Sequence, residues 1–180
     1  MIYNFNLGIG WASSGVEYAQ SYRAVMLRNI GADAKFVFTD MISTENIEHL
    51  TKNIGFLDSE IIWLYTFFTD YKIAPVTFVL DDLKKTLPTD EYTYVRNGKT
   101  GRLVLQGSNN YCAVYFVDEK SERVHRVEIV SGGYLIRKDY YTYGRVFSEY
   151  YAPLDKKAHM YLRRFFNEDG TVAYEEINDD

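Results

Sequence analysis

The chain has 180 residues and a formal net charge of −5 at pH 7, with 47% hydrophobic and 25% charged residues. This composition excludes an intrinsically disordered chain, and the length suits one large domain or two small ones. A single cysteine, Cys112, excludes an internal disulfide framework and a cysteine-rich metal site, and it favours a reducing compartment. The aromatic residues, 17% of the chain, favour strands.

The acidic residues gather late in the sequence. Residues 165–180 hold six acids and no base, whereas the residues before them carry 20 bases and 19 acids. This balance gives no indication of a nucleic-acid partner. The longest apolar run, residues 61–68, is far shorter than the ~20 residues of a membrane-spanning helix, and the first residues lack the basic region and cleavage site of a targeting peptide. We expect a cytoplasmic protein.

The first third of the chain alternates between strand and helix patterns. Residues 2–7 alternate as a strand does, and a loop with two glycines follows. Ser14 and Glu17 have the spacing of a capping box, which opens a helix that ends before Gly31. Residues 35–38 then indicate a second strand.

The middle of the chain is harder to assign. A second helix is expected to open at Ser43 or Thr44 and to end at Gly55. Residues 58–69 suit a buried strand or a buried helix, and we favour a helix that Asp58 or Ser59 caps.

Turn signals recur about every ten residues from position 90 onward, as in successive antiparallel strands. Before them, residues 76–80 indicate a strand and residues 81–87 a short helix closed by Pro88. Asn97-Gly98 is the strongest turn signal, and it predicts a type I′ hairpin. Twelve of the 17 tyrosines lie in residues 92–174. The expected strands of this β-meander include residues 111–117, 124–130, 134–140, 145–151 and 158–166.

The expected fold class is therefore α+β, with a partial α/β unit in residues 1–80 and an extended antiparallel β-meander in residues 81–180. The boundary between them lies within residues 72–91.

The glycine loop and the helix after it form the first candidate site. The amides of Gly15, Val16, Glu17 and Tyr18 make up the first helical turn, where unpaired N–H groups and the helix dipole favour a phosphate. Neither the dinucleotide fingerprint nor the P-loop fingerprint is met. A structural reading stays equally open, in which Ser14 simply caps the helix and occupies a donor that the ligand would need.

Other chemistry-bearing residues favour structural roles. His49, His125 and His159 have neither helical spacing nor a neighbouring cysteine, so no metal site is expected. Asp81 and Asp82 are explained by helix capping, and Cys112 by packing in an apolar strand. The basic residues of the meander alternate with aromatic ones, which could suit single-stranded nucleic acid, but a surface for a protein or peptide is the better interpretation.

Several long stretches resemble one family. The run IYNFNLGIGWASSGVEYAQSYRAVMLRNIGADAKFVFTDM is similar to the amino terminus of the catalytic glycosyltransferases of the bacterial accessory Sec system. The stretches IIWLYTFFTDYKIAP, LIRKDYYTYGRVFSEYYAP and FFNEDGTVAYEE are similar to the same family in the same order. The resemblance covers essentially the whole chain.

This resemblance implies a retaining GT-B glycosyltransferase that transfers N-acetylglucosamine from UDP-N-acetylglucosamine to Ser and Thr of serine-rich repeat adhesins. The first of its two Rossmann-like lobes is interrupted by an extended β-sheet domain, which would be the meander. The donor nucleotide would contact Gly15, Val16, Glu17 and Tyr18 next to Ser14. The sheet would dock the acceptor polypeptide and a homologous, catalytically inactive partner subunit. No cofactor or metal, and at most a peripheral association with the inner face of the membrane, would be expected.

The resemblance also implies a much longer protein, whose second lobe supplies the basic residues that hold the UDP phosphates and the carboxylates that bind the sugar and ribose. We therefore expect no catalytic residue in this chain and no transferase activity from these residues alone, because half of the donor site is missing. Two alternatives stay open. The chain could be a stand-alone module that binds a protein or peptide without catalysis, or a relative of the glycosyltransferases that modify wall teichoic acid.

Overall fold

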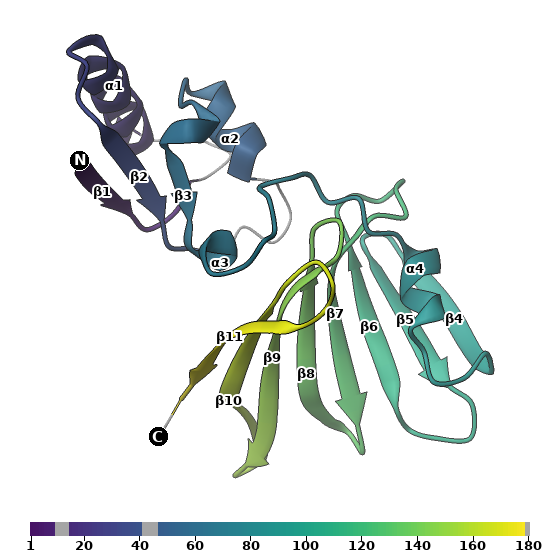
Figure 1. The fold of residues 1–180 in the computed structure, drawn as a ribbon. Coiled ribbons are helices and arrows are strands. Elements are labelled where there is room, and N and C mark those ends of the chain that lie inside the picture. The colour runs from purple at the N-terminus through teal and green to yellow at the C-terminus, as the bar shows by residue number, and fades with distance from the viewer. Residues whose placement is uncertain (10–14, 41–46, 179–180) are drawn as a thin grey trace. The chain divides into compact units, whose positions relative to one another are not determined.

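The computed structural model describes residues 1–9, 15–40 and 47–178 of the chain. They form two compact units, Met1–Pro75 and Val76–Asp180, each with its own sheet and its own hydrophobic core (Figure 1). Within these ranges, no helix is both long enough and apolar enough to cross a membrane.

The first unit is built on a three-stranded parallel sheet in the order β1-β2-β3. The middle strand, β2, is buried at Phe36, Val37 and Phe38, because it has a neighbour on each side and helices pack against it. In chain order the elements are β1 (Ile2–Asn6), α1 (Gly15–Asn29), β2 (Ala34–Phe38), α2 (Ile47–Asn53), the 3-10 turn η1 (Asp58–Glu60), β3 (Ile61–Trp63) and α3 (Leu64–Phe67).

The expected first strand, first helix and second strand are all confirmed. Helix α1 ends where Gly31 adopts a φ of +69°, a left-handed conformation that glycine takes without a steric penalty. The helix is then tied to the loop before β3. Arg28 donates from Nε and Nη2 to the two carboxylate oxygens of Glu60, each at 2.8 Å, and the Ser21 hydroxyl donates to the Ile54 carbonyl. These contacts hold the helix against the segment that precedes β3.

The helix predicted over residues 58–69 is wrong. Residues Ile61–Trp63 form the strand β3, which pairs in parallel with β2, and only Leu64–Phe67 are α-helical. Ile61 and Trp63 are both buried, and the Trp63 indole nitrogen donates to the Asp40 carbonyl at 3.0 Å. A short strand with apolar residues throughout has no alternating pattern, so its period could not distinguish it from a helix. The opening of the second helix at Ser43 or Thr44 lies outside the described residues.

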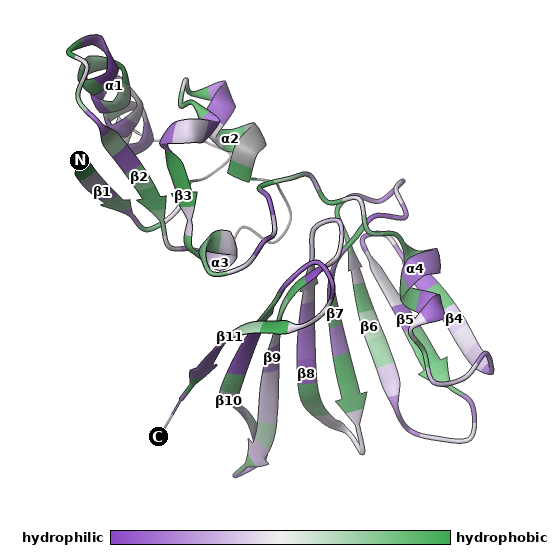
Figure 2. Ribbon diagram, viewed as in Figure 1, coloured by the Kyte–Doolittle hydropathy of each residue, from purple (hydrophilic) through white to green (hydrophobic). Residues whose placement is uncertain are grey.

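The second unit is an eight-stranded antiparallel meander whose strands neighbour one another in sequence order, as predicted. Its strands carry both hydrophobic and hydrophilic residues (Figure 2). The α4 helix (Leu80–Lys85) places the buried Leu80 and Leu83 against a core that includes Leu103, Val114 and Phe116. The strands are β4 (Tyr92–Asn97), β5 (Thr100–Leu105), β6 (Tyr111–Phe116), β7 (Val124–Ser131), β8 (Tyr134–Tyr141), β9 (Arg145–Leu154), β10 (Lys157–Phe166) and β11 (Val172–Ile177).

The strand predicted over residues 76–80 is also wrong. This segment makes one isolated bridge, between Val79 and Arg123, and Leu80 already belongs to α4. The segment is nevertheless anchored to the sheet, because the amides of Thr77 and Phe78 both donate to the Thr142 carbonyl at 3.0 Å. The Phe78 ring stacks on Tyr141 with centroids 4.1 Å apart. The segment is therefore attached to the sheet by these contacts without forming a strand of it.

The hairpin between β4 and β5 differs from the predicted turn. Asn97 pairs with Thr100, so the two turn residues are Gly98 and Lys99, and only Gly98 has a positive φ, +58°. A type I′ turn requires positive φ at both central positions, so that turn type is wrong here. Gly132 and Gly133, with φ of +57° and +85°, meet this requirement between β7 and β8.

Candidate functional site

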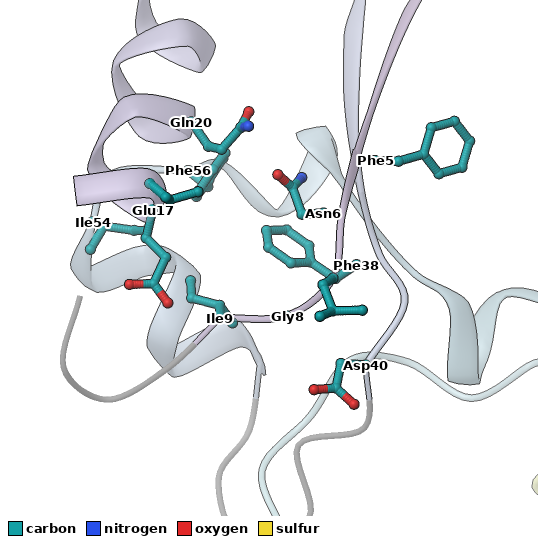
Figure 3. Close-up of a pocket in the computed structure, with 12 residues that line it drawn as sticks. Phe5, Asn6, Gly8, Ile9, Glu17, Gln20, Phe38, Asp40, Ile54 and Phe56 are labelled. Atoms are coloured by element: carbon teal, nitrogen blue, oxygen red, sulfur yellow. The ribbon is translucent and has the colours of Figure 1, made fainter. Parts of the chain in front are cut away.

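The first unit contains a pocket of about 500 Å³ at the carboxyl ends of β1 and β2, beside the amino-terminal half of α1 (Figure 3). In the parallel register, Asn6 lies opposite Phe38, so the chain leaves both strands at the same edge of the sheet. This edge is where open α/β sheets bind their ligands, because the loops that follow the strands diverge there.

The two loops that follow β1 and β2 lie in close contact. The Thr39 amide and hydroxyl both donate to the Asn6 carbonyl, at 3.1 and 3.2 Å. A Cβ atom at Gly8 would lie 3.1 Å from both Cβ and Oδ2 of Asp40. Glycine therefore allows a close approach of the two loops, and a larger residue would require the Asp40 side chain to shift slightly.

Apolar residues form one wall of the pocket. Phe38 and Phe56 are 2% and 3% exposed and pack edge to face, with ring centroids 5.9 Å apart. Ile9 and Ile54 also line the pocket. Because these side chains belong to the core of the unit, the wall is held in place by the same packing that stabilises the fold.

The polar residues of the pocket are acids and amides. Glu17 and Gln20 come from α1, Asn6 ends β1, and Asp40 lies just after β2. Among the described residues that line the pocket, none is Lys, Arg or His. The side-chain oxygen Oε1 of Gln20 is buried and has no hydrogen-bond partner within the described part of the chain.

Only some of the site residues that the sequence predicted line this pocket. Val16 and Glu17 line it, whereas Gly15 and Tyr18 do not. Gly15 begins α1 and is exposed, and a Cβ atom added to it would meet nothing within 4 Å. Ser14 lies outside the described residues, so its role as a cap stays a prediction, as does the nucleotide contact of Ser14, Gly15, Val16, Glu17 and Tyr18.

Sequence reasoning missed the pocket residues Asn6, Gln20 and Asp40. A usable signal was present, since Asn6 and Asp40 are polar residues at the ends of two strands that the pattern had correctly predicted. Gln20 follows Glu17 and Val16 at three- and four-residue spacing on α1, and such residues share one face of a helix.

The described residues contain no group of three or more His, Cys, Asp or Glu side chains that could hold a metal ion. His125 is buried in β7, where burial lowers the pKa of its imidazole to about 4. Cys112 is buried in β6, and burial raises the pKa of its thiol. A neutral imidazole and a protonated thiol in a sheet core are consistent with the packing roles expected for both residues.

The large sheet carries a network of paired charges and aromatic rings on β8 to β11. The Glu149 carboxylate is 8% exposed and accepts hydrogen bonds from the hydroxyls of Tyr140 and Tyr151, at 3.0 and 2.7 Å, and from Arg163 at 2.8 Å. Arg163 also donates to Glu176 at 2.7 Å. Burial opposes ionisation of Glu149, but these donors hold the pKa of its carboxyl below the ordinary value.

Several basic residues of this sheet stack on aromatic rings. Arg102 lies 3.8 Å from the ring centroid of Tyr111, and Arg126 lies 3.9 Å from that of Tyr115. Arg96 lies 3.8 Å from the ring centroid of Phe116. The aromatic and basic residues that alternate in the sequence therefore contact one another within the sheet. The stacked guanidinium groups cover ring faces on which nucleic-acid bases would have to stack.

Known proteins resemble this chain in both sequence and structure. The chain is 56% identical, over 98% of its length, to the UDP-N-acetylglucosamine–peptide N-acetylglucosaminyltransferase GtfA subunit of Streptococcus agalactiae, and it covers 35% of that protein. It is 52% identical to a chain in a crystal structure of a GtfA/B complex, with a TM-score of 0.86, covering 100% of this chain and 36% of that one.

A crystal structure of the pneumococcal O-GlcNAc transferase GtfA in complex with UDP and GlcNAc matches equally well. Its TM-score is 0.86 at 49% identity, covering 99% of this chain and 35% of that one. The present chain thus spans about a third of the length of the relatives that it matches. The family model of the GtfA extended beta-sheet domain matches residues 93–180, which are β4 to β11 except for the first residue of β4. The chain is therefore similar over nearly its whole length to about a third of the GtfA subunits, and its residues 93–180 match the GtfA extended beta-sheet domain.

Proposed function

We propose that this chain is part of a glycosyltransferase that transfers N-acetylglucosamine from UDP-N-acetylglucosamine to Ser and Thr hydroxyls of a serine-rich polypeptide. The identity to GtfA subunits, 56% over nearly the whole chain, carries the proposal. The pocket at the carboxyl ends of β1 and β2 supports it, because this is the ligand-binding edge of an α/β sheet.

The chain contributes one wall of the donor site and no catalytic residue of its own. The first turn of α1 holds the donor phosphates through the amides of Gly15, Val16, Glu17 and Tyr18, at the positive end of a 15-residue helix. The exposed Gly15, with open space around its Cβ position, leaves room for a phosphate to approach these amides. The opposing phosphate and sugar contacts come from the rest of the enzyme. The donor site as proposed uses no metal ion.

Titration with UDP tests the phosphate contact. A longer enzyme is made by replacing the matching third of the S. agalactiae relative with this chain, and UDP affinity is measured by calorimetry for the parent and for Gly15→Trp. The indole would fill the space in front of the helix, and we expect affinity to fall at least tenfold. Met26→Trp, at an exposed position on α1 that does not line the pocket, is the control. Unchanged affinity in Gly15→Trp would remove the phosphate role.

The extended beta-sheet domain is proposed to dock a homologous, catalytically inactive glycosyltransferase subunit together with the acceptor polypeptide. The GtfA/B complex, to one chain of which this chain is 52% identical, supports this assignment. The continuous eight-stranded sheet, with the two edge strands β4 and β11, provides the surface. Size-exclusion chromatography of the chain with the partner subunit tests it. We expect co-elution, and separate peaks at micromolar concentrations would argue against docking through this chain.

A further inference from the structure

The β4 strand forms one of the two edges of the extended sheet, and its main chain is open to pairing with another polypeptide. We infer that this edge receives the acceptor polypeptide as an additional strand, held by main-chain hydrogen bonds. The inference rests on the proposed function, since the S. agalactiae relative is a peptide N-acetylglucosaminyltransferase. It adds the place and the manner in which the polypeptide is held.

The hairpin register shows which main-chain groups of β4 face the free edge. Asn97 pairs with Thr100 across a two-residue turn, and the Gln106 amide donates to the Glu91 carbonyl at 3.0 Å. Because hydrogen-bonded and non-hydrogen-bonded positions alternate in an antiparallel pair, the odd-numbered residues of β4 bond to β5 and the even-numbered ones turn their amides and carbonyls outward. Within the described ranges, the outward groups, which take part in no other backbone hydrogen bond, belong to Tyr92, Tyr94 and Arg96.

The β4 strand lacks the features that protect a sheet edge. Its pairing with β5 runs without a register shift over all six residues, so no bulge twists this edge away. Arg96 is its one charged residue, and the guanidinium group turns back onto carbonyls of the loop between β6 and β7. The opposite edge is protected, because β11 carries Glu175 and Glu176 and its pairing with β10 shifts register between Phe165 and Phe166.

The surroundings of β4 favour small, uncharged side chains in an added strand. On one face, Tyr94 packs against the core to which α4 contributes, and the Lys84 ammonium of α4 lies 5.9 Å from the centre of its ring (Figure 1). Side chains of an added strand on this face would lie beside the helix, where small ones fit. On the other face, Thr93 and Asn97 are exposed and can hydrogen-bond to hydroxyl groups of a neighbouring strand. Serine and threonine meet both conditions.

Main-chain recognition also suits the proposed reaction. Strand addition gives affinity through backbone hydrogen bonds, so binding depends little on the order of the side chains. A transferase that modifies many hydroxyl groups along one serine-rich polypeptide needs this tolerance. A pocket for one particular side-chain sequence would instead restrict the enzyme to a single segment.

Amide hydrogen exchange, measured by NMR on the 180-residue chain, tests the inference. The probe is an uncharged peptide of serine, threonine and alanine that spans the six residues of β4. The outward amides of Tyr92, Tyr94 and Arg96 should exchange about tenfold more slowly when the peptide is saturating. The amides of β11 should exchange at the same rate with and without peptide. Protection at β11 in place of β4, or no protection by the peptide, would overturn the inference.

A modified peptide separates main-chain pairing from side-chain contacts. N-methyl groups on two consecutive central residues keep every side chain, but one of them faces β4 in any register and removes a donor there. We expect the affinity of this peptide for the chain to be about tenfold lower than that of the unmodified one. Equal affinities of the two peptides would contradict strand addition.

Two variants of the chain place the pairing at β4. Tyr92→Pro removes one outward amide at the first residue of the strand, a position where proline is tolerated. Tyr92→Ala is the matched control, because it removes the same ring and keeps the amide. Peptide affinity should be about fivefold lower in Tyr92→Pro than in Tyr92→Ala. The same affinity in both variants would count against pairing at this edge, and the comparison of the two peptides does not depend on either variant.

Other occupants of the β4 edge would be recognised in the same exchange experiment. Protection of its outward amides that grows with the concentration of the chain, without peptide, would assign the edge to a second copy. Protection by the partner subunit and not by the peptide would assign it to that subunit. Either result overturns the inference.

Failure of this inference can be told apart from failure of the proposed function. In the longer chimeric enzyme, Tyr92→Pro should raise the KM for the peptide about fivefold relative to Tyr92→Ala, with an unchanged KM for UDP-N-acetylglucosamine. An equal KM for the peptide in the two variants refutes strand addition alone. Peptide binding at β4 of the 180-residue chain, combined with a folded chimera that transfers nothing, refutes the proposed function.

Discussion

Arg163 on β10 donates to Glu149 on β9 at 2.8 Å and, with its other terminal nitrogen, to Glu176 on β11 at 2.7 Å. One guanidinium group therefore ties three adjacent strands together. Its neighbour Arg164 pairs with Glu175 at 2.6 Å, but both of those side chains are 40% exposed. Adjacent positions of one strand thus provide a half-buried ion pair and an exposed one.

Arg163→Met is expected to destabilise the chain by about 3 kcal/mol, because it leaves the buried Glu149 carboxylate with only its two tyrosine donors. Arg164→Met, the control on the same strand, should cost about 0–1 kcal/mol, since an exposed pair is screened by water. Urea denaturation of the two variants measures both values. Equal losses of unfolding free energy in the two variants would show that the burial of Glu149 does not increase the cost of removing its arginine partner.

The stability of the chain should fall on acidification partly through His125. Burial lowers its pKa to about 4 in the folded chain, against about 6.5 when unfolded, so the unfolded chain binds a proton first. The neutral imidazole contributes its full stabilisation above pH 6.5, and this stabilisation is lost as the pH falls from 6.5 to 4. By pH 5 the loss in unfolding free energy amounts to about 2 kcal/mol.

His125→Gln removes this titration, so the difference in unfolding free energy between pH 7 and pH 5 should shrink by about that amount relative to the parent. Chemical denaturation at the two pH values measures it. His159→Gln, at a half-buried position on β10, is the control. A pH dependence that is identical in the parent and in His125→Gln would show that other groups account for the acid sensitivity.

Arg96 is expected to hold the loop between β6 and β7. Its Nη2 donates to the carbonyls of Asp118, Glu119 and Ser121 at 2.9–3.1 Å, and its Nη1 donates to Glu122. Lysine lacks the planar fork that reaches these acceptors together. Arg96→Lys should cost about 1–2 kcal/mol and speed hydrogen exchange at Ser121, which NMR can follow. Arg102→Lys, an exposed residue stacked on Tyr111, should leave that exchange rate unchanged.

The β1 strand is expected to make the isolated chain self-associate. In the described residues, β1 pairs with β2 along one edge only, and its Tyr3 and Phe5 are 53% and 73% exposed. An apolar strand with an unpaired edge is a template for pairing with another chain. Sedimentation velocity should show concentration-dependent association that Tyr3→Lys reduces. The control Lys52→Glu alters surface charge on α2 without touching β1, and it should leave association in place.

The periodic patterns of residues 2–38 predicted the first two strands and the first helix, and the turn signals that recur about every ten residues predicted the meander. Residues Ile61–Trp63 were assigned to a helix because a short strand that is apolar along its whole length has no such period. Val16 and Glu17, which line the pocket, were among the residues that the helix start had singled out. Asp40 and Gln20 were missed because their proximity depends on the parallel pairing of β1 with β2, which local sequence does not specify.

The central claim is that this chain supplies one wall of a UDP-N-acetylglucosamine-dependent transferase. Transfer of radiolabelled N-acetylglucosamine to a serine-rich polypeptide tests it most directly, using the chain alone and the chimera in which it replaces the matching third of the S. agalactiae relative. We predict no transfer by the chain alone and transfer within tenfold of the parent by the chimera. Turnover by the isolated chain, or a folded chimera with no activity, would contradict the claim.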